Sequence, residues 1–141
     1  MEIEYSHELS ALDYNRLRRS AGWADLTLEQ AKMGLANSAY VIAARCGGDV
    51  VGMARYLSDG GYVRYISDVV VLPEYQGREI GRHMLEEILA HIRKNKKDDE
   101  YISINLMAAA EKEGFYQKLG FEVRPSEQFG AGLTLNLERV K

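Results

Sequence analysis

The sequence predicts an α/β fold of the α+β kind, in which a central mixed, mostly antiparallel and twisted sheet is flanked by about four helices. Strand-like segments joined by glycine turns fill residues 40–71, and a long amphipathic helix and a further strand follow. Tight glycine turns join antiparallel strands, whereas a strand that returns after a helix lies parallel to the strand before it. Together these segments give a mixed sheet.

The first third of the chain predicts one strand and two short helices. Polar and apolar residues alternate over Glu2–Tyr5, as in a half-buried strand. Ser10 is suited to cap a helix that reaches Arg19. A second helix, extending towards Leu35, is opened by the capping box Thr27-Leu28-Glu29-Gln30.

The middle of the chain predicts an antiparallel meander. Tyr40–Arg45 and Val50–Leu57 have strand-like composition, and Gly47-Gly48-Asp49 between them is a hairpin signal. A second turn at residues 58–61 leads into a strand over Tyr62–Val71.

The chain is organised around the unit from Asp68 to Arg82. Its apolar run Val69–Leu72 predicts a strand buried on both faces, Pro73 ends this strand, and apolar residues recur at helical spacing from Ile80. The glycine-bearing loop between strand and helix directs backbone N–H groups and the positive end of a helix dipole into one small space, which suits a phosphate or pyrophosphate. An ordinary strand-to-helix turn is the alternative interpretation.

The last third predicts another strand, a helix and two closing strands. Tyr101–Leu106 is expected to lie parallel to the strand before the loop, and Ala108–Lys118 is expected to be helical. The closing strands are expected over Phe121–Val123 and Leu133–Leu137. No internal repeat, linker or low-complexity segment appears, so residues 1–141 are expected to form a single domain.

Composition excludes several classes of protein. A net charge of −3 argues against nonspecific nucleic-acid binding, which depends on basic surfaces. No apolar run is long enough to span a membrane. Cys46 is the only cysteine and the first residues lack signal-peptide features, so a cytoplasmic location is expected. The three histidines lack metal-ligand spacing, so no metal is expected, and His83 and His91 are expected on the solvent side of a helix.

Two motifs resemble those of the Gcn5-related N-acetyltransferase (GNAT) family. Residues 76–81, Gln-Gly-Arg-Glu-Ile-Gly, match the signature Q/R-x-x-G-x-G/A, and residues 113–121 resemble the segment F-Y-x-K-L-G-F. The resemblance covers roughly Tyr40 to Phe121. Two positions depart from the family pattern, because Glu79 replaces the central glycine and Ala109 replaces a frequent asparagine.

This resemblance implies a sheet that splays in the middle, with acetyl-CoA as the co-substrate in the gap. Backbone groups of Val69, Val70 and Val71 would bind the pantetheine arm like an added strand. The implied pyrophosphate site consists of Gln76, Gly77, Arg78, Glu79, Ile80, Gly81 and Arg82. Tyr116 matches the general acid of the family, which protonates the departing CoA thiolate.

The acceptor amine must lose a proton to attack, and Asp68 is the candidate base or base relay. A structural carboxylate that caps a loop is the alternative for Asp68. Tyr65 and Ser67 are expected on the opposite strand face, because side chains alternate along a strand unless a β-bulge intervenes.

The acceptor pocket is expected between the early helices and the hairpins. Each candidate also has an ordinary interpretation as surface charge or core aromatic. The candidates are Arg18, Arg19, Trp23, Tyr56, Asp59, Tyr62, Tyr65 and Ser67.

The resemblance therefore implies an acetyl-CoA-dependent N-acetyltransferase that moves an acetyl group directly to a primary amine of a small molecule or peptide. A CoA-binding sensor or interaction module of the same fold, with weak or no catalysis, is the alternative. The expected partner is the amine, without nucleic acid or membrane, and a homodimer is compatible with the resemblance.

Overall fold

The computed structural model describes residues 2–138. The chain divides into two compact units, Met1–Leu106 and Met107–Lys141, and each unit is described by itself.

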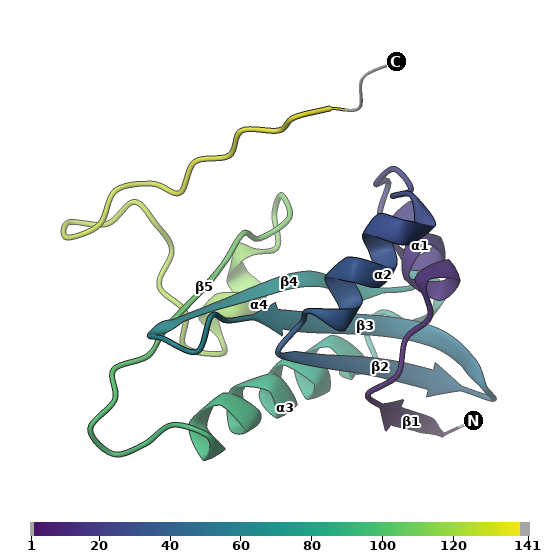
Figure 1. Cartoon of the computed structure of the whole chain (residues 1–141), viewed down its shortest axis with the longest axis horizontal. Helices are drawn as coiled ribbons and strands as arrows, with labels where there is room; N and C mark the ends of the chain where they lie inside the picture. Colours follow the sequence, from purple (N-terminus) through teal and green to yellow (C-terminus); the bar gives the residue numbers. More distant parts are fainter. Residues whose placement is uncertain (1, 139–141) are drawn as a thin grey trace. The chain divides into compact units, whose positions relative to one another are not determined.

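The first unit is built on a sheet in which the strands follow one another in chain order (Figure 1). β1 to β4 pair antiparallel, and β5 pairs parallel to β4. The predicted meander and the predicted parallel return are therefore confirmed. The strands are β1 (Ile3–Ser6), β2 (Tyr40–Cys46), β3 (Asp49–Leu57), β4 (Val63–Val71) and β5 (Ser103–Leu106).

Three helices of the first unit begin where the sequence predicts. They are α1 (Ala11–Ser20), α2 (Leu28–Ala36) and α3 (Ile80–Lys94). Ser10 Oγ accepts a hydrogen bond from the Asp13 N–H at 3.1 Å, and Thr27 Oγ1 accepts one from the Gln30 N–H at 3.1 Å. Both caps satisfy a donor that the helix itself leaves unpaired. Among residues 2–138, no helix is long and apolar enough to cross a membrane.

The helices cover both faces of the sheet. α1 and α2 lie on one face and α3 lies on the other (Figure 1). On the first face, Tyr14 and Leu17 of α1 form a buried cluster with Met53 and Val70 of the sheet. On the second face, α3 approaches β3 closely, because a side chain at Gly52 would meet Ile80 and Met84 at 3.3 Å. The apolar residues of α3 that the helical spacing selected are buried: Ile80, Met84, Leu85, Ile88, Leu89 and Ile92.

The apolar run Val69–Leu72 is less buried than the sequence predicts. Val70 is buried, but Val69 and Val71 are only half-buried. The pairing of β4 explains the difference, since β5 stops before it reaches this part of β4.

The second unit contains one short helix, α4 (Glu113–Gln117), between residues 107 and 138. The predicted helix from Ala108 starts later, because Glu111 takes a left-handed conformation (φ 68) that a right-handed helix does not admit. The predicted strands at Phe121–Val123 and Leu133–Leu137 are wrong, since no strand is present among residues 107–138. Alternation of apolar residues suits a strand, but a strand forms only where a partner supplies hydrogen bonds.

Candidate active site

β4, the strand next to the edge strand β5, has a partly free edge of its own. β5 pairs with β4 only from Val63 to Ile66, whereas β4 continues to Val71 and stays paired with β3 on its other side. From Ser67 to Val71, β4 has no strand partner on the β5 side among residues 2–138. This is the splay that the resemblance implied. Unpaired backbone N–H and C=O groups of this kind can receive an extended ligand as if it were an added strand.

A β-bulge interrupts β4 within this free stretch. Met53 of β3 faces Val70, and Arg55 faces Ser67, so β4 carries one residue more than β3 over the same length. Asp68 takes a left-handed conformation there, with φ 57. A bulge shifts the side-chain alternation by one position.

The bulge changes the strand face on which Asp68 lies. The side chains of Arg55 and Asp68 are hydrogen bonded, and Ser67 is the cross-strand partner of Arg55. Cross-strand partners share a face. Ser67 therefore lies on the same face as Asp68, and so does Tyr65 by alternation. The expectation that these two residues lie on the opposite face is wrong, and the bulge is the reason.

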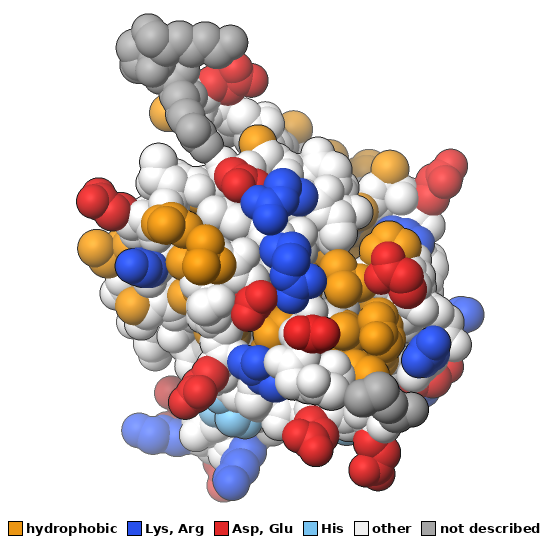
Figure 2. All heavy atoms as spheres, turned by 90° about the vertical axis from the view of Figure 1, so that its right-hand side faces the viewer, with side chains coloured by type: hydrophobic (Ala, Val, Ile, Leu, Met, Phe, Trp, Pro, Cys, Tyr) orange, Lys and Arg blue, Asp and Glu red, His pale blue; other side chains and the backbone are white. Residues whose placement is uncertain are grey.

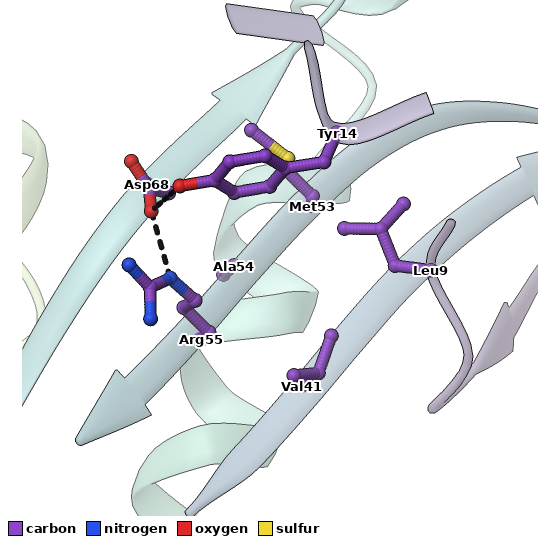
Figure 3. A pocket seen from close by; sticks show the side chains of 7 residues that line it. All are labelled: Leu9, Tyr14, Val41, Met53, Ala54, Arg55 and Asp68. Atoms are coloured by element: carbon purple, nitrogen blue, oxygen red, sulfur yellow. Dashed lines mark hydrogen bonds and ion pairs between the residues drawn. The ribbon is translucent and has the colours of Figure 1, made fainter. Parts of the chain in front are cut away.

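The carboxylate of Asp68 is bound from two elements (Figure 3). It accepts a hydrogen bond from Tyr14 Oη of α1 at 2.6 Å and another from Arg55 Nε of β3 at 2.7 Å. The Arg18 guanidinium lies 3.6 Å from its other oxygen, and the side chain of Asp68 is only 9% exposed. The hollow beside this cluster has essentially no volume for a water-sized group.

Arg55 extends this cluster to the second helix. Its guanidinium also donates to the carbonyl oxygen of Gly34 at 3.3 Å and to Ser38 Oγ at 3.2 Å. Although burial opposes its charge, the hydrogen bond to Asp68 raises the pKa of Arg55. Burial, followed by the hydrogen bond to Asp68, raises the pKa of Tyr14. These hydrogen bonds connect the bulge of β4 to the start of α1 and to the end of α2.

The loop after β4 offers backbone amides at the start of a long helix. A short 3₁₀ turn, Pro73–Tyr75, follows the strand, and Gln76 donates to the Val71 carbonyl oxygen at 3.0 Å. Gly77 has φ 80, and no side chain caps α3. The first N–H groups of α3 are therefore left to a ligand or to solvent.

Two arginines accompany these amides. The guanidinium of Arg78 lies 5.0 Å from the centre of the Tyr75 ring, in a cation–π contact next to the loop. Arg82 forms an ion pair with Glu86 one turn along α3, at 2.6 Å. Of these two arginines, Arg82 alone shares its charge with a carboxylate among the described ion pairs.

The proposed acceptor residues fall into separate groups. Arg18 lies 5.6 Å from the Trp23 ring and next to Asp68, so these residues and the half-buried Ser67 form one neighbourhood. Tyr62 is 58% exposed and stacks on Tyr101 at 5.8 Å, ahead of the start of β4. The bulge is therefore several residues away from Tyr62 along the strand.

The remaining acceptor candidates have other contacts. Arg19 pairs with Asp25 at 2.7 Å, and Asp59 accepts a hydrogen bond from the Gly61 N–H inside its own turn. Tyr56 is hydrogen bonded to His91 of α3, which places it on the other face of the sheet.

Sequence reasoning missed Tyr14 and Arg55. Tyr14 lies 54 residues from its hydrogen-bond partner Asp68, and neither Tyr14 nor Arg55 belongs to a motif. The only available signal is a pair of polar side chains at positions where the helix and the strand face the core.

Tyr116 belongs to the second unit. It lies in α4 and is buried, with edge-on contacts to Phe115 at 5.0 Å and Phe121 at 6.1 Å between ring centres. Burial raises the pKa of Tyr116 to about 12. The phenol therefore keeps its proton throughout the physiological range.

Comparison with known proteins identifies the family. The model of the acetyltransferase (GNAT) domain matches residues 19–136. The chain belongs to the GNAT acetyltransferases. An uncharacterized N-acetyltransferase, ycf52, from Pyropia yezoensis is 31% identical over 123 residues, which cover 84% of this chain and 68% of that protein.

Solved GNAT structures agree with this assignment. A probable acetyltransferase of unknown function from Staphylococcus aureus is 28% identical, with a TM-score of 0.85 over 96% of this chain and 100% of that chain. A GNAT family acetyltransferase from Brucella melitensis, solved in complex with acetyl-CoA, shares the fold with a TM-score of 0.64 and 18% identity, over 86% of this chain and 84% of that chain.

The two departures from the GNAT pattern have different structural consequences. Glu79 has φ 64, so it takes the left-handed conformation that a glycine adopts easily, and the loop geometry is kept. Ala109 lies in a turn, where its carbonyl oxygen accepts from the Lys112 N–H at 3.0 Å. An alanine side chain cannot replace the hydrogen bonds of an asparagine. Among residues 2–138, no group of three or more His, Cys, Asp or Glu could hold a metal ion.

Proposed function

We propose that this GNAT protein transfers the acetyl group of acetyl-CoA to a primary amine of a small molecule or peptide, by direct transfer. The free edge of β4 carries the proposal, because it leads directly into the loop that offers its amides at the start of α3. The pantetheine arm of acetyl-CoA needs an extended binding edge, and the pyrophosphate joined to it needs backbone amides beyond the end of that edge. The Brucella melitensis protein of the same fold, solved with acetyl-CoA, supports this co-substrate.

The pantetheine arm would lie along the free edge, bound by backbone groups of Val69, Val70 and Val71. Its amide groups would replace the missing strand partner. The pyrophosphate would bind the amides after Gly77, with Arg78 as the nearest unshared positive charge. The whole loop segment proposed to bind it is Gln76, Gly77, Arg78, Glu79, Ile80, Gly81 and Arg82.

The transfer itself needs no covalent enzyme intermediate. The neutral amine nitrogen attacks the thioester carbonyl carbon, a C–N bond forms and the C–S bond breaks. The amine loses one proton to the base, and the CoA thiolate takes one proton from the phenol of Tyr116, which solvent then restores. With a pKa of about 12, Tyr116 holds that proton at every working pH.

For Asp68 we propose a positioning role, which the sequence allowed beside the base role. Its carboxylate is occupied by Tyr14 and Arg55, and Arg18 lies close by. These contacts hold the bulge that presents the backbone of β4 to the thioester. Water would then accept the amine proton, and the base role of Asp68 is one outcome of the pH–rate experiment below.

The acceptor amine is proposed to approach on the face of the sheet covered by α1 and α2. Ser67 and Tyr65 of β4 lie on that face, and Arg18 with Trp23 borders it. Tyr62 would contact only a longer acceptor, such as a peptide, because it lies ahead of the start of β4.

Partner classes and location are part of the proposal. On the face in Figure 2, Lys and Arg side chains lie next to Asp and Glu, and no continuous basic surface forms. This arrangement, with the net charge of −3, supports the absence of a nucleic-acid partner. The single cysteine supports a cytoplasmic location.

The test follows thiol release from acetyl-CoA with a panel of arylalkylamines, polyamines, amino sugars and lysine peptides. CoA binding is measured separately by calorimetry. Turnover with at least one amine is expected, and Tyr116→Phe is expected to reduce kcat about a hundredfold while leaving CoA affinity unchanged. Tight CoA binding without turnover on any amine would overturn the proposal in favour of a CoA-binding sensor, which the missing asparagine at Ala109 also favours.

A further inference from the structure

The guanidinium of Arg18 is held in place next to the bulge of β4. Its Nε donates to the Ala24 carbonyl oxygen at 2.9 Å, and the Trp23 N–H donates to the Arg18 carbonyl oxygen at 3.0 Å. The guanidinium also lies 5.9 Å from the centre of the Tyr14 ring and 5.6 Å from that of the Trp23 ring. Because these contacts already fix the side chain, little conformational entropy would be lost when a ligand binds it.

Most of the hydrogen-bonding capacity of Arg18 is unused. A guanidinium carries N–H donors on Nε, Nη1 and Nη2. Among residues 2–138, only Nε finds an acceptor, since Nη1 lies 3.6 Å from Asp68 Oδ1, which is too long for a hydrogen bond. No described side-chain nitrogen or oxygen that is buried lacks a hydrogen-bond partner, so Nη1 and Nη2 are accessible to solvent. A ligand can therefore reach both groups.

Two guanidinium groups share one carboxylate in this part of the site. Arg55 lies 2.7 Å from Asp68 and is its closer ion-pair partner, whereas Arg18 lies 3.6 Å away and has no other carboxylate among the described ion pairs. A positive excess repels an ammonium ion and lowers its pKa, which favours the neutral amine that the attack requires. An acceptor with its own negative charge next to the amine would turn this repulsion into attraction.

We propose that the acceptor is a free amino acid and that Arg18 binds its carboxylate. The inference rests on the proposed function and names the class of amine that the site accepts. A guanidinium and a carboxylate form two parallel N–H···O bonds, for which Nη1 and Nη2 of Arg18 provide the donors. The amine and the carboxylate of an α-amino acid are attached to the same carbon. An amino acid on Arg18 therefore places its amine next to the bulge, since Arg18 is 3.6 Å from Asp68.

Arg18 selects and positions the acceptor in this arrangement and takes no proton. The amine nitrogen attacks the thioester held along the free edge of β4, so that the C–N bond forms and the C–S bond breaks. The amine proton passes to water, and the carboxylate keeps its charge throughout. The half-buried ring of Trp23, beside Arg18, would pack against the side chain of the amino acid.

Kinetics test the carboxylate contact. Thiol release from acetyl-CoA is followed with the standard amino acids and with their amides, which keep the size and lose the negative charge. Arg18→Met is expected to lower kcat/KM for the best amino acid about tenfold, mainly through KM, and to leave that of its amide nearly unchanged. Arg18→Lys keeps the charge without the fork and should lie between them. Arg93→Met, exposed on α3, is the control and should match the parent. Equal losses for acid and amide, or turnover of other amines but of no amino acid, overturn the inference.

Binding of the product tests the same contact without turnover. Trp23 is the only tryptophan, so its fluorescence reports on ligands next to Arg18. The CoA-loaded protein is titrated with N-acetyl amino acids and with the matching N-acetyl amides. The parent is expected to bind the best acid about tenfold more tightly than its amide. This comparison needs no variant, so it decides the inference even where Arg18→Met does not fold.

The two measurements separate this inference from the proposed function. A protein that prefers the acids in the titration but acetylates no amine has the carboxylate contact and lacks the transfer activity. A protein that acetylates amines but binds acid and amide equally has the activity, and the inference about Arg18 is then wrong.

Discussion

Asp68 accepts a hydrogen bond from Arg55 at 2.7 Å while its own backbone is held at φ 57, so a strained strand residue and a buried ion pair coincide. Left-handed backbone is unfavourable for residues other than glycine, although Asp and Asn tolerate it better than most. Such a conformation persists where its surroundings determine it. Here Arg55, Tyr14 and the register of β3 and β4 do so.

Asp68→Asn is expected to destabilise the protein by about 3 kcal/mol, because it leaves the guanidinium of Arg55 buried without its anion. Asparagine tolerates the left-handed backbone, so the change isolates the lost charge. Urea unfolding measures the loss. Asp98→Asn, at an exposed position in the turn after α3, is the control and should change stability little.

The same variant separates the two roles of Asp68 in catalysis. If Asp68 only positions the bulge, Asp68→Asn lowers kcat at all pH values and keeps the shape of the pH–rate profile. If kcat of the parent rises with pH and this rise is lost in the variant, Asp68 is instead the base.

Glu79→Gly is expected to stabilise the protein and to strengthen CoA binding. Glycine relieves the left-handed strain at φ 64, worth about 1 kcal/mol, and removes a negative charge beside the expected pyrophosphate. Glu79→Ala is the matched control, since it removes the charge and keeps the strain. A higher melting temperature in the glycine variant only, with tighter CoA binding in both, is the expected pattern, and no gain of stability would show that the strain is compensated.

Arg78→Ala is expected to weaken CoA binding about tenfold, or about 1.4 kcal/mol, since its guanidinium lies beside the loop and lacks a carboxylate partner among the described ion pairs. The loss should shrink at high salt. Arg93→Ala, at the far end of the same helix, is the control. Equal effects of the two substitutions on CoA affinity in calorimetry would contradict the proposed pyrophosphate site.

The extent to which the sequence predicted this structure depends on whether a signal is local. The caps at Ser10 and Thr27 and the start of α3 at Ile80 were predicted correctly, because a cap or a helical stripe is set by residues within one turn. The expected strand over Leu133–Leu137 shows the opposite case. Its alternation is a correct local signal for a strand, but the pairing depends on a partner that local sequence does not contain.

In the candidate site as well, the features set by local sequence could be predicted and the non-local ones could not. The loop at Gly77 follows from a continuous motif, whereas the cluster of Tyr14, Arg55 and Asp68 depends on a bulge and on helix packing over 54 residues of separation. His91 was expected to face solvent, but it is half-buried and stacks on Tyr40 at 4.0 Å. Tyr40 of β2 and Tyr56 of β3 contact His91 from the sheet, and helical spacing alone does not show this.

Tyr116 provides a prediction at high pH. Its pKa is about 12 in the folded protein because of burial, against about 10 in an unfolded chain. A raised folded-state pKa gives stability that is complete below pH 10 and is lost as the pH rises towards 12. Melting temperatures of the parent should therefore fall more steeply between pH 9.5 and 11 than those of Tyr116→Phe. The same slope in both proteins would mean that the phenol is not buried in solution.

The last prediction concerns His91 and mild acid. Its imidazole is hydrogen bonded through Nδ1 to Tyr56 Oη at 2.8 Å, and its ring stacks on Tyr40. Burial is the main cause that lowers the pKa of His91 below its usual value, and the neighbouring charges of His7 and Lys94 lower it further. The folded protein therefore binds a proton here less readily than the unfolded chain.

A depressed folded-state pKa gives stability that is present above the unfolded value of about 6.5 and is lost as the pH falls below it. The melting temperature should therefore decrease from pH 7.5 to pH 5.5, and His91→Gln should reduce this dependence although it lowers the melting temperature at pH 7.5 through the lost ring contact. His83→Gln is the control, because His83 is exposed and pairs with Glu87 at 3.0 Å. An undiminished slope in His91→Gln would assign the acid sensitivity to another group.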